Sequence, residues 1–176
     1  MKTYIFKTNK KSYFLNIIYC SIDINDIENY LKRIERAKKS QKSKTNLIVI
    51  PNYKIFSLEQ LKWAVFVAKN KFLEKINVSK SLWNEIILTL CATDQINRIS
   101  KNWFLKNGNN KNVFLITLSE NKIDSKEINK IKKELGIEEI KINEIEFNKK
   151  EVLELYKISD VGLDADVENK VIEKMS

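Results

Sequence analysis

The sequence predicts a single α/β domain in which a mixed β-sheet with an N-terminal hairpin packs against several helices. Short runs of aromatic and β-branched residues alternate with longer segments of helical spacing, which is typical of this fold class. The 176 residues, 43% of them apolar, can bury one substantial core. Only three glycines and one proline punctuate the chain, so little divides residues 1–176 into separate modules.

The predicted strands begin with the hairpin. Tyr4–Phe6 and Ser12–Tyr19 are rich in aromatic and β-branched residues, and Asn9–Lys11 can turn the chain between them. Later apolar runs predict further buried strands, which are Leu47–Ile50, stopped by Pro51, then Val113–Leu118, and one or two strands within Ile137–Phe147.

Helices are predicted where apolar residues recur at helical spacing behind a residue that can cap the first turn. The helix after the hairpin is expected to be capped by Asp23 or Asn25 and to run to about Lys39. The central helices are expected to start at Ser57, at Ser79 or Ser81, and at Asp94, with the last ending at the loop Asn107–Asn110. The C-terminal helices are expected at Ser125–Leu135, closed by Gly136, at Lys149–Ile158 and at Asp164–Met175.

Positive charge is concentrated in the first part of the chain. Residues 1–111 hold 21 Lys/Arg against 8 Asp/Glu, and residues 112–176 hold 11 against 15, so the parts carry +13 and −4. The densest run, Lys32–Lys44, has seven positive charges and one negative. Such a one-sided distribution favours a polyanionic partner such as a nucleic-acid backbone. For the run alone, a solvated helix end is an equally good explanation.

The common kinds of catalytic site are missing. Without histidine, the Ser/His/Asp and Cys/His arrangements and most zinc sites are excluded. Three isolated glycines cannot form a phosphate-binding loop, and Asp164–Asp166 lacks the glycine and glutamate of a calcium loop. Cys20 and Cys91 lie in apolar runs, as buried thiols in a reducing compartment do. We therefore expect no enzyme activity, no metal and no cofactor.

No apolar stretch approaches the roughly 20 residues that cross a bilayer. The N-terminal residues Met1–Phe6 lack the long apolar region of a secretory signal. We expect a cytoplasmic protein without membrane contact.

Two central motifs are more specific. Residues Ile55–Leu61 read Ile-Phe-Ser-Leu-Glu-Gln-Leu, and Ser79–Ile96 follow Ser-x-x-Leu-x-x-Glu-Ile-Ile-Leu-x-Leu-x-x-x-Asp-Gln-Ile. Over about forty residues this order resembles the kinase-binding accessory subunit of the KEOPS complex, the PRPK-binding protein (TPRKB) family. Two positions depart from that family: its frequent histidine is Gln60 here, and its usual glycine after the third helix is replaced by the longer loop Asn107–Asn110.

The resemblance, to the archaeal type, extends over the whole chain and implies a non-catalytic subunit of the machinery that makes threonylcarbamoyladenosine on tRNA. It implies two partners. One is the small lobe of a Bud-type kinase/ATPase subunit. The other is tRNA, which would be bound through its single-stranded 3′ CCA end.

With that resemblance, basic and aromatic residues of the central helices become candidate tRNA contacts. Arg98, Lys101 and Asn102 share one face of the predicted third helix. The remaining basic candidates lie on or beside the preceding helix and are Lys54, Lys62 and Lys69. Tyr53 or Phe56 is expected to offer a ring to an unstacked base, with core packing as the alternative for each.

For the kinase contact we expect apolar residues of the last two helices, which are Leu155, Leu163, Val167, Val171 and Met175. Closing the core is an equally good explanation for these residues. Two further functions stay open: a basic RNA-binding module unrelated to KEOPS, and a histidine-free nuclease or transferase that uses carboxylates and a metal.

Overall fold

The computed structural model describes residues 1–8, 11–41, 45–95, 97, 99, 101–141, 145, 147, 153, 154, 156 and 164–175, with the side chains of residues 164–168 excepted. The chain divides into two compact units, each made of two separate segments. Unit 1 comprises residues 1–52 and 104–145, and unit 2 comprises residues 53–103 and 146–176.

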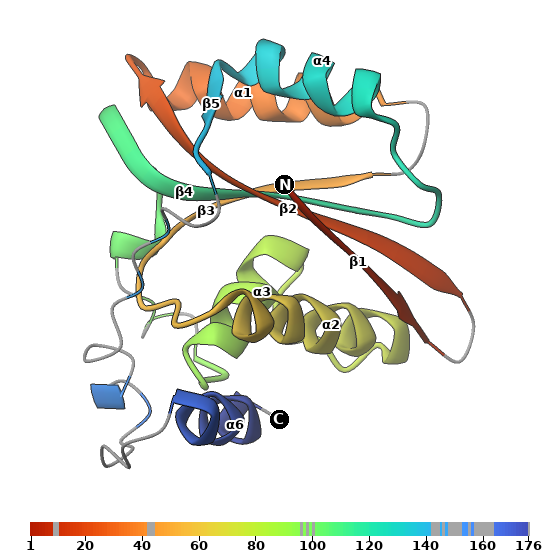
Figure 1. Cartoon of the computed structure of the whole chain (residues 1–176), viewed down its shortest axis with the longest axis vertical. Coiled ribbons are helices and arrows are strands. Elements are labelled where there is room, and N and C mark those ends of the chain that lie inside the picture. Colours follow the sequence, from red (N-terminus) through yellow and green to blue (C-terminus); the bar gives the residue numbers. More distant parts are fainter. Residues whose placement is uncertain are drawn as a thin grey trace. The chain divides into compact units, whose positions relative to one another are not determined.

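Unit 1 is built on an antiparallel sheet (Figure 1). Its described strands are β1 (Lys2–Lys7), β2 (Ser12–Ile24), β3 (Asn46–Pro51), β4 (Gly108–Ser119) and β5 (Ile137–Glu139). They lie in the order β1-β2-β4-β3, and β5 pairs with β2 beyond the end of β1. The N-terminal hairpin and the combination of helices with a sheet confirm the predicted α/β class. The prediction of a mixed sheet is wrong for the described strands, which all pair antiparallel.

Helices α1 (Ile27–Lys39) and α4 (Ser125–Leu135) cover one face of this sheet (Figure 1). Alternate residues of β2, among them Ile18, Cys20 and Ile22, pack with apolar residues of both helices in one buried cluster. Residues on the other face of β2, such as Ile17 and Tyr19, are buried as well. Burial on both faces explains why the β2 sequence is apolar at nearly every position.

Strands β2 and β4 are longer than the sequence predicts. The end of β2 pairs with the start of β4, with Ile24 opposite Gly108 and Ile22 opposite Asn110. The prediction that Asn107–Asn110 is a loop is therefore wrong for Gly108 to Asn110. The Asn110 side chain stabilises this start, because its amide donates to the carbonyl oxygens of Lys106 (2.7 Å) and Gly108 (2.9 Å).

The ends of α1 and α4 follow from their capping residues. Asp26, rather than Asp23 or Asn25, caps α1, and its carboxylate accepts from the N–H of Glu28 at 2.9 Å. Asp23 is not available, because it lies in β2. Helix α4 has the predicted bounds and ends at Gly136 in the left-handed conformation (φ 63°).

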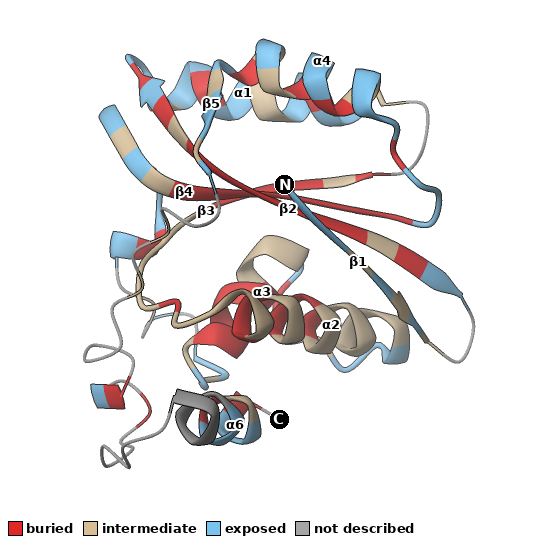
Figure 2. Ribbon diagram, in the orientation of Figure 1, coloured by how far each residue is buried: buried red, intermediate tan, exposed pale blue. Residues whose placement is uncertain are grey.

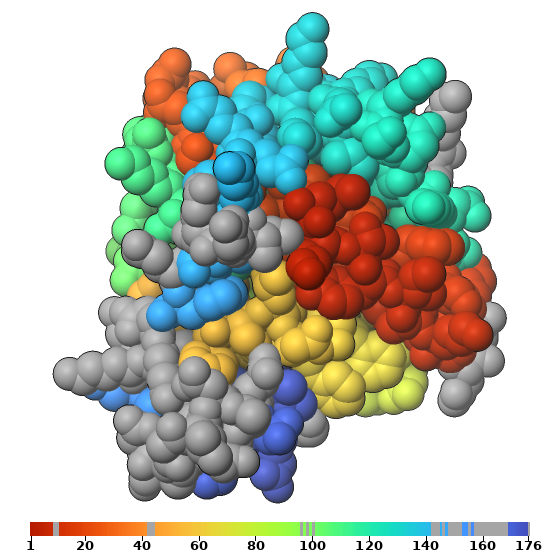
Figure 3. Space-filling view, in the orientation of Figure 1, coloured from red at the N-terminus to blue at the C-terminus, as the bar shows by residue number. Residues whose placement is uncertain are grey.

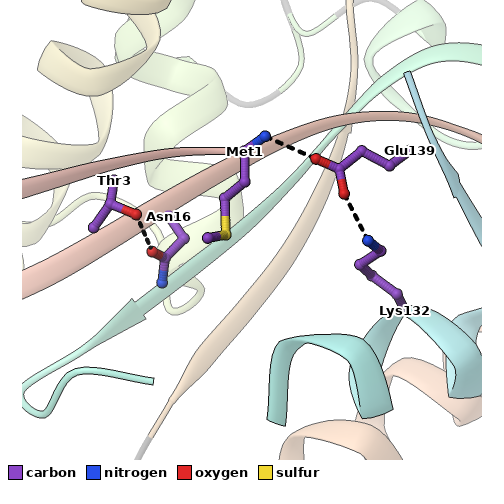
Figure 4. Close-up of polar contacts among 5 residues, drawn as sticks. All are labelled: Met1, Thr3, Asn16, Lys132 and Glu139. Atoms are coloured by element: carbon purple, nitrogen blue, oxygen red, sulfur yellow. Dashed lines mark hydrogen bonds and ion pairs between the residues drawn. The ribbon is translucent and has the colours of Figure 1, made fainter. Parts of the chain in front are cut away.

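Polar contacts link Met1 to β5 and Thr3 to β2 in unit 1 (Figure 4). The Glu139 carboxylate on β5 lies 2.7 Å from the N-terminal ammonium of Met1 and 2.6 Å from Lys132 Nζ. Thr3 Oγ1 donates to Asn16 Oδ1 at 2.8 Å, and the Asn16 amide donates to Thr117 Oγ1 at 2.9 Å. The N-terminus at Met1 accordingly lies beside β5 (Figure 3).

Unit 2 contains α2 (Leu58–Glu74), α3 (Leu82–Leu90), the 3₁₀ turn η2 (Lys101–Trp103) and α6 (Asp164–Met175). Helix α2 packs against both α3 and α6. Both α2 and α3 carry buried residues (Figure 2). They include Leu61, Ala64, Val65, Ile86 and Ile87. The predicted cap Ser57 is confirmed, and its hydroxyl accepts from the Gln60 N–H at 3.0 Å.

The predicted third helix, from Asp94 to the loop that begins at Asn107, is wrong over the residues that are described. Helix α3 ends at Leu90, and Ala92 adopts a left-handed conformation (φ 47°). The Thr93 hydroxyl then accepts from the Gln95 N–H at 3.2 Å, a local turn that competes with helix formation. Among the described residues that follow, Asn97 and the short turn η2 have 3₁₀ geometry, while Ile96 and Arg98 lie outside the description.

At the C-terminus, α6 has the predicted bounds. Of the predicted helix Lys149–Ile158, the described residues Leu153, Glu154 and Tyr156 are helical, and the rest lie outside the description. None of the described helices combines the length and the apolar character that a bilayer crossing requires.

Candidate nucleic-acid and partner-binding surfaces

Four of the predicted tRNA contacts lie at one place in unit 2, around the buried ring of Trp103. Tyr53 meets Trp103 edge-on, with ring centroids 5.3 Å apart and an interplanar angle of 84°. Lys54 Nζ lies 5.5 Å from the centroid of the Tyr53 ring. Lys101 and Asn102 directly precede Trp103 in η2 and are exposed. We call these five residues the Trp103 cluster.

The local backbone explains how the cluster is held. Trp103 is only 1% exposed and fixes the ring of Tyr53, which is itself half-buried. Lys54 adopts a left-handed conformation (φ 55°), unusual for a residue with a side chain, at the point where the chain turns into buried Ile55. The cluster thus combines a fixed aromatic edge, two cations and an amide, the groups that bind single-stranded nucleic acids.

A thiol adjoins the cluster. Burial raises the pKa of Cys91 to about 11, while the charge of Lys54 and a hydrogen bond with Trp103 act in the opposite direction. Cys91 is therefore a neutral thiol at physiological pH, without the lowered pKa of a nucleophilic cysteine.

The other predicted tRNA contacts are not in this cluster. Lys62 and Lys69 are half-buried on α2, and Lys62 forms an ion pair with Glu59. Phe56 is half-buried too, so it is not a fully buried core residue. Arg98 lies outside the described residues.

Gln60, the position where the resembled family often has histidine, is part of a buried hydrogen-bonded chain. Its Oε1 accepts from the backbone N–H of Phe56, and its Nε2 donates to the Tyr156 hydroxyl at 3.3 Å. The Tyr156 hydroxyl in turn donates to the carbonyl oxygen of Leu90 at the end of α3. This chain links the start of α2, the end of α3 and the C-terminal segment, so the role of Gln60 is structural.

Glu85, the carboxylate of the second motif, is fully buried on α3. Its Oε2 accepts from the Ser79 N–H at 2.8 Å, and its Oε1 lies 3.5 Å from Lys71 Nζ on α2. The side chain thereby holds the loop between α2 and α3. Sequence reasoning missed this role, although a lone carboxylate inside an apolar helix is a signal for a buried polar partner.

The predicted kinase contacts have a different environment from the one expected. Val171 is fully buried and Met175 is 5% exposed, which favours the alternative that they close the core of unit 2. Leu155 and Leu163 lie outside the described residues, as does the side chain of Val167.

Within the described ranges, no three His, Cys, Asp or Glu residues are placed to hold a metal ion. Cys20 and Cys91 are free thiols, and burial raises the pKa of Cys20 to about 12. The acidic pair Glu138 and Glu139 is exposed on strand β5.

One comparison with known proteins is informative. The model of a family described as kinase binding protein CGI-121 matches residues 23–176. No curated protein matches the chain. The family match begins in β2 and includes α1, both central motifs and α6. Because it covers far more than half of the sequence, the chain belongs to the CGI-121 family of kinase-binding proteins.

Proposed function

We propose that this protein is a non-catalytic, regulatory subunit of a cytoplasmic KEOPS complex that makes threonylcarbamoyladenosine on tRNA. It binds the Bud-type kinase/ATPase subunit and recruits tRNA through the 3′ CCA end. Membership of a kinase-binding family over residues 23–176 carries this proposal. Both units belong to one domain under this proposal, because each is assembled from two separate chain segments and the family match spans both.

The Trp103 cluster supports the tRNA part of the proposal. A single-stranded end exposes base faces and phosphates together, so its binding site needs a ring and cations close to each other. Tyr53 supplies the ring, and Lys54 and Lys101 supply the cations. We propose further contacts with the same single-stranded tRNA end for the remaining predicted residues, which are Lys62, Lys69, Arg98 and Asn102.

The kinase contact is proposed for the C-terminal helices. Val171 and Met175 are buried and hold α6 in unit 2. We therefore propose that the kinase contacts Leu155, Leu163 and Val167. Because its buried residues fix α6 in unit 2, the helix does not need to be ordered when a partner binds. A pre-ordered contact surface favours tight association.

Titration of the purified protein with a Bud-type kinase, followed by size-exclusion chromatography, tests the first partner. We expect a stoichiometric complex that Val167→Asp weakens and that Lys170→Glu, an exposed control on the same helix, leaves unchanged. Circular dichroism melting shows whether a variant that fails to bind is still folded. If the chain binds tRNA but no kinase, the alternative of a basic RNA-binding module unrelated to KEOPS replaces this proposal.

A further inference from the structure

The outer surface of α1 and α4 is strongly basic, which the distribution of charge along the sequence does not predict for α4. Residues 112–176 carry a net −4, yet α4 lies within them and holds four lysines against two glutamates. Helix α1 holds five Lys/Arg against two glutamates. The two helices together therefore carry +5 on one layer of unit 1.

The cations on each helix follow the same spacing, i, i+4 and i+7. They are Lys32, Arg36 and Lys39 on α1, and Lys126, Lys130 and Lys133 on α4. All six are exposed, whereas Tyr30 and Ala37 of α1 and Ile128, Ile131 and Leu135 of α4 are buried. Since helical residues with these spacings share a side, both rows point away from the sheet. We call these six residues the α1–α4 basic face.

Helices α1 and α4 lie side by side (Figures 1 and 2), and a specific contact joins them. The Arg33 guanidinium donates to the carbonyl oxygen of Glu134 in the last turn of α4, with Nε at 3.1 Å. Its charge lies 5.5 Å from the Tyr30 ring centroid on α1. Arg33 thus satisfies a free carbonyl at the C-terminus of α4 and fixes that end of the helix against α1.

The six cations are available to a ligand. Among the ion pairs of the described residues, none involves a member of the α1–α4 basic face. Three of the six, Lys32, Arg36 and Lys39, also line a shallow hollow of about 360 Å³ on the surface of α1.

We infer that the α1–α4 basic face binds the phosphate backbone of a folded RNA, at a surface separate from the Trp103 cluster. Seven residues along a helix span about 10 Å, so each row offers its charges over a length that covers several phosphates. Such contacts position an RNA without reading its sequence. With the proposed function, on which this assignment of the RNA rests, the ligand is the body of the tRNA.

Two other anionic partners fit the surface less well. Adsorption to a membrane requires an apolar helix face that enters the bilayer, and the apolar faces of α1 and α4 are buried in unit 1. A protein interface requires an apolar or aromatic centre, and Leu31 is the one large exposed apolar residue on the described parts of these helices.

The test compares a face variant, Lys32→Gln/Arg36→Gln/Lys130→Gln, with a control, Lys2→Gln/Lys7→Gln/Lys80→Gln. Both remove three exposed positive charges. Binding is measured over a range of salt concentrations with intact tRNA, with tRNA lacking its CCA end, and with anionic phosphatidylglycerol vesicles. Thermal melting confirms that each variant is folded.

We expect the face variant to bind both tRNAs more than about tenfold more weakly than the control at low salt. The slope of log K against log salt should fall by about 0.9 for each phosphate that the variant no longer neutralises. Equal behaviour of the two variants, or a face that binds vesicles and not RNA, overturns the inference. If the face variant has its effect while removal of the CCA end has none, the CCA part of the proposed function fails alone.

Discussion

The side-chain amide of Gln60 donates to the hydroxyl of Tyr156 at 3.3 Å, across 96 positions of sequence and with both side chains buried. The hydrogen bond ties the first turn of α2 to the C-terminal segment. Burial raises the pKa of Tyr156, while the hydrogen bond with Gln60 acts in the opposite direction. The tyrosine hydroxyl therefore stays protonated and donates to Leu90.

Replacement of Gln60 tests this buried chain. Gln60→Leu should lower the free energy of unfolding by about 2 kcal/mol, because the partly buried Phe56 N–H loses its acceptor and the buried Tyr156 hydroxyl loses its donor. Gln60→His should lower it less, since a neutral imidazole has both an acceptor and a donor. Chemical denaturation of both variants, combined with Tyr156→Phe in a double-mutant cycle, measures the coupling. Additive effects of Gln60→Leu and Tyr156→Phe would contradict the hydrogen bond.

Glu85 provides a second test of the interior of unit 2. Glu85→Ala should cost about 3 kcal/mol of unfolding free energy, because the buried Ser79 N–H is left without an acceptor and a cavity forms. Glu85→Gln keeps an acceptor and should cost less. Glu74→Ala, which removes an exposed carboxylate from α2, is the control and should change the unfolding free energy little. A loss of stability for Glu85→Ala no larger than that for Glu74→Ala would refute the importance of the hydrogen bond to Ser79.

The ion pairs of Glu139 should make the free energy of unfolding depend on pH. The hydrogen bond from Lys132, followed by that from the N-terminal ammonium, lowers the pKa of Glu139 below its ordinary value. The carboxylate is thus stabilised in the folded state, and this contribution is present at neutral pH and lost as the pH falls through the lowered pKa.

We expect Glu139→Gln to be less stable than the wild type at pH 7 and the difference to shrink at acid pH. Glu138→Gln, on the same exposed strand, is the control and should change little at any pH. Urea denaturation between pH 7 and about pH 3, below the ordinary pKa of Glu, measures both. A difference for Glu139→Gln that stays constant over this range would contradict the role given to the carboxylate.

The Trp103 cluster predicts effects on RNA binding. Lys54→Gln and Lys101→Gln should each weaken binding of a single-stranded oligonucleotide ending in CCA and lower the salt slope by about 0.7. Tyr53→Ala should cost about 1 to 3 kcal/mol of binding if a base stacks on the ring, whereas Tyr53→Phe should retain the affinity. Fluorescence anisotropy measures all four variants. If Tyr53→Ala binds as tightly as the wild type while remaining folded, the ring has no part in binding.

Local sequence signals predicted the helices whose ends are set by their own capping residues. Helix α4 has its predicted bounds because Asp124 and Gly136 supply both caps, and Ser57 starts α2 for the same reason. Strands β2 and β4 extend beyond their apolar runs because each completes the hydrogen bonds of the other, which no local pattern reveals. The predicted third central helix does not form over the described residues, because Thr93 turns the chain after α3.

The candidate sites were predictable only in part. Tyr53, Lys54 and Lys101 were recognisable from residue type, but their meeting around Trp103 depends on the turn that the sequence did not indicate. The α1–α4 basic face was hidden because its two rows lie about 90 positions apart in the sequence. In both cases, tertiary structure brings together side chains from segments that lie far apart along the chain.

The most direct test of the proposed function is the affinity of the complex between this protein and a Bud-type kinase for two tRNAs, one intact and one shortened by its CCA end. We predict tighter binding of the intact tRNA, with the difference abolished by Lys54→Gln/Lys101→Gln. Equal affinity for both tRNAs, or no complex with the kinase, would contradict the proposed function.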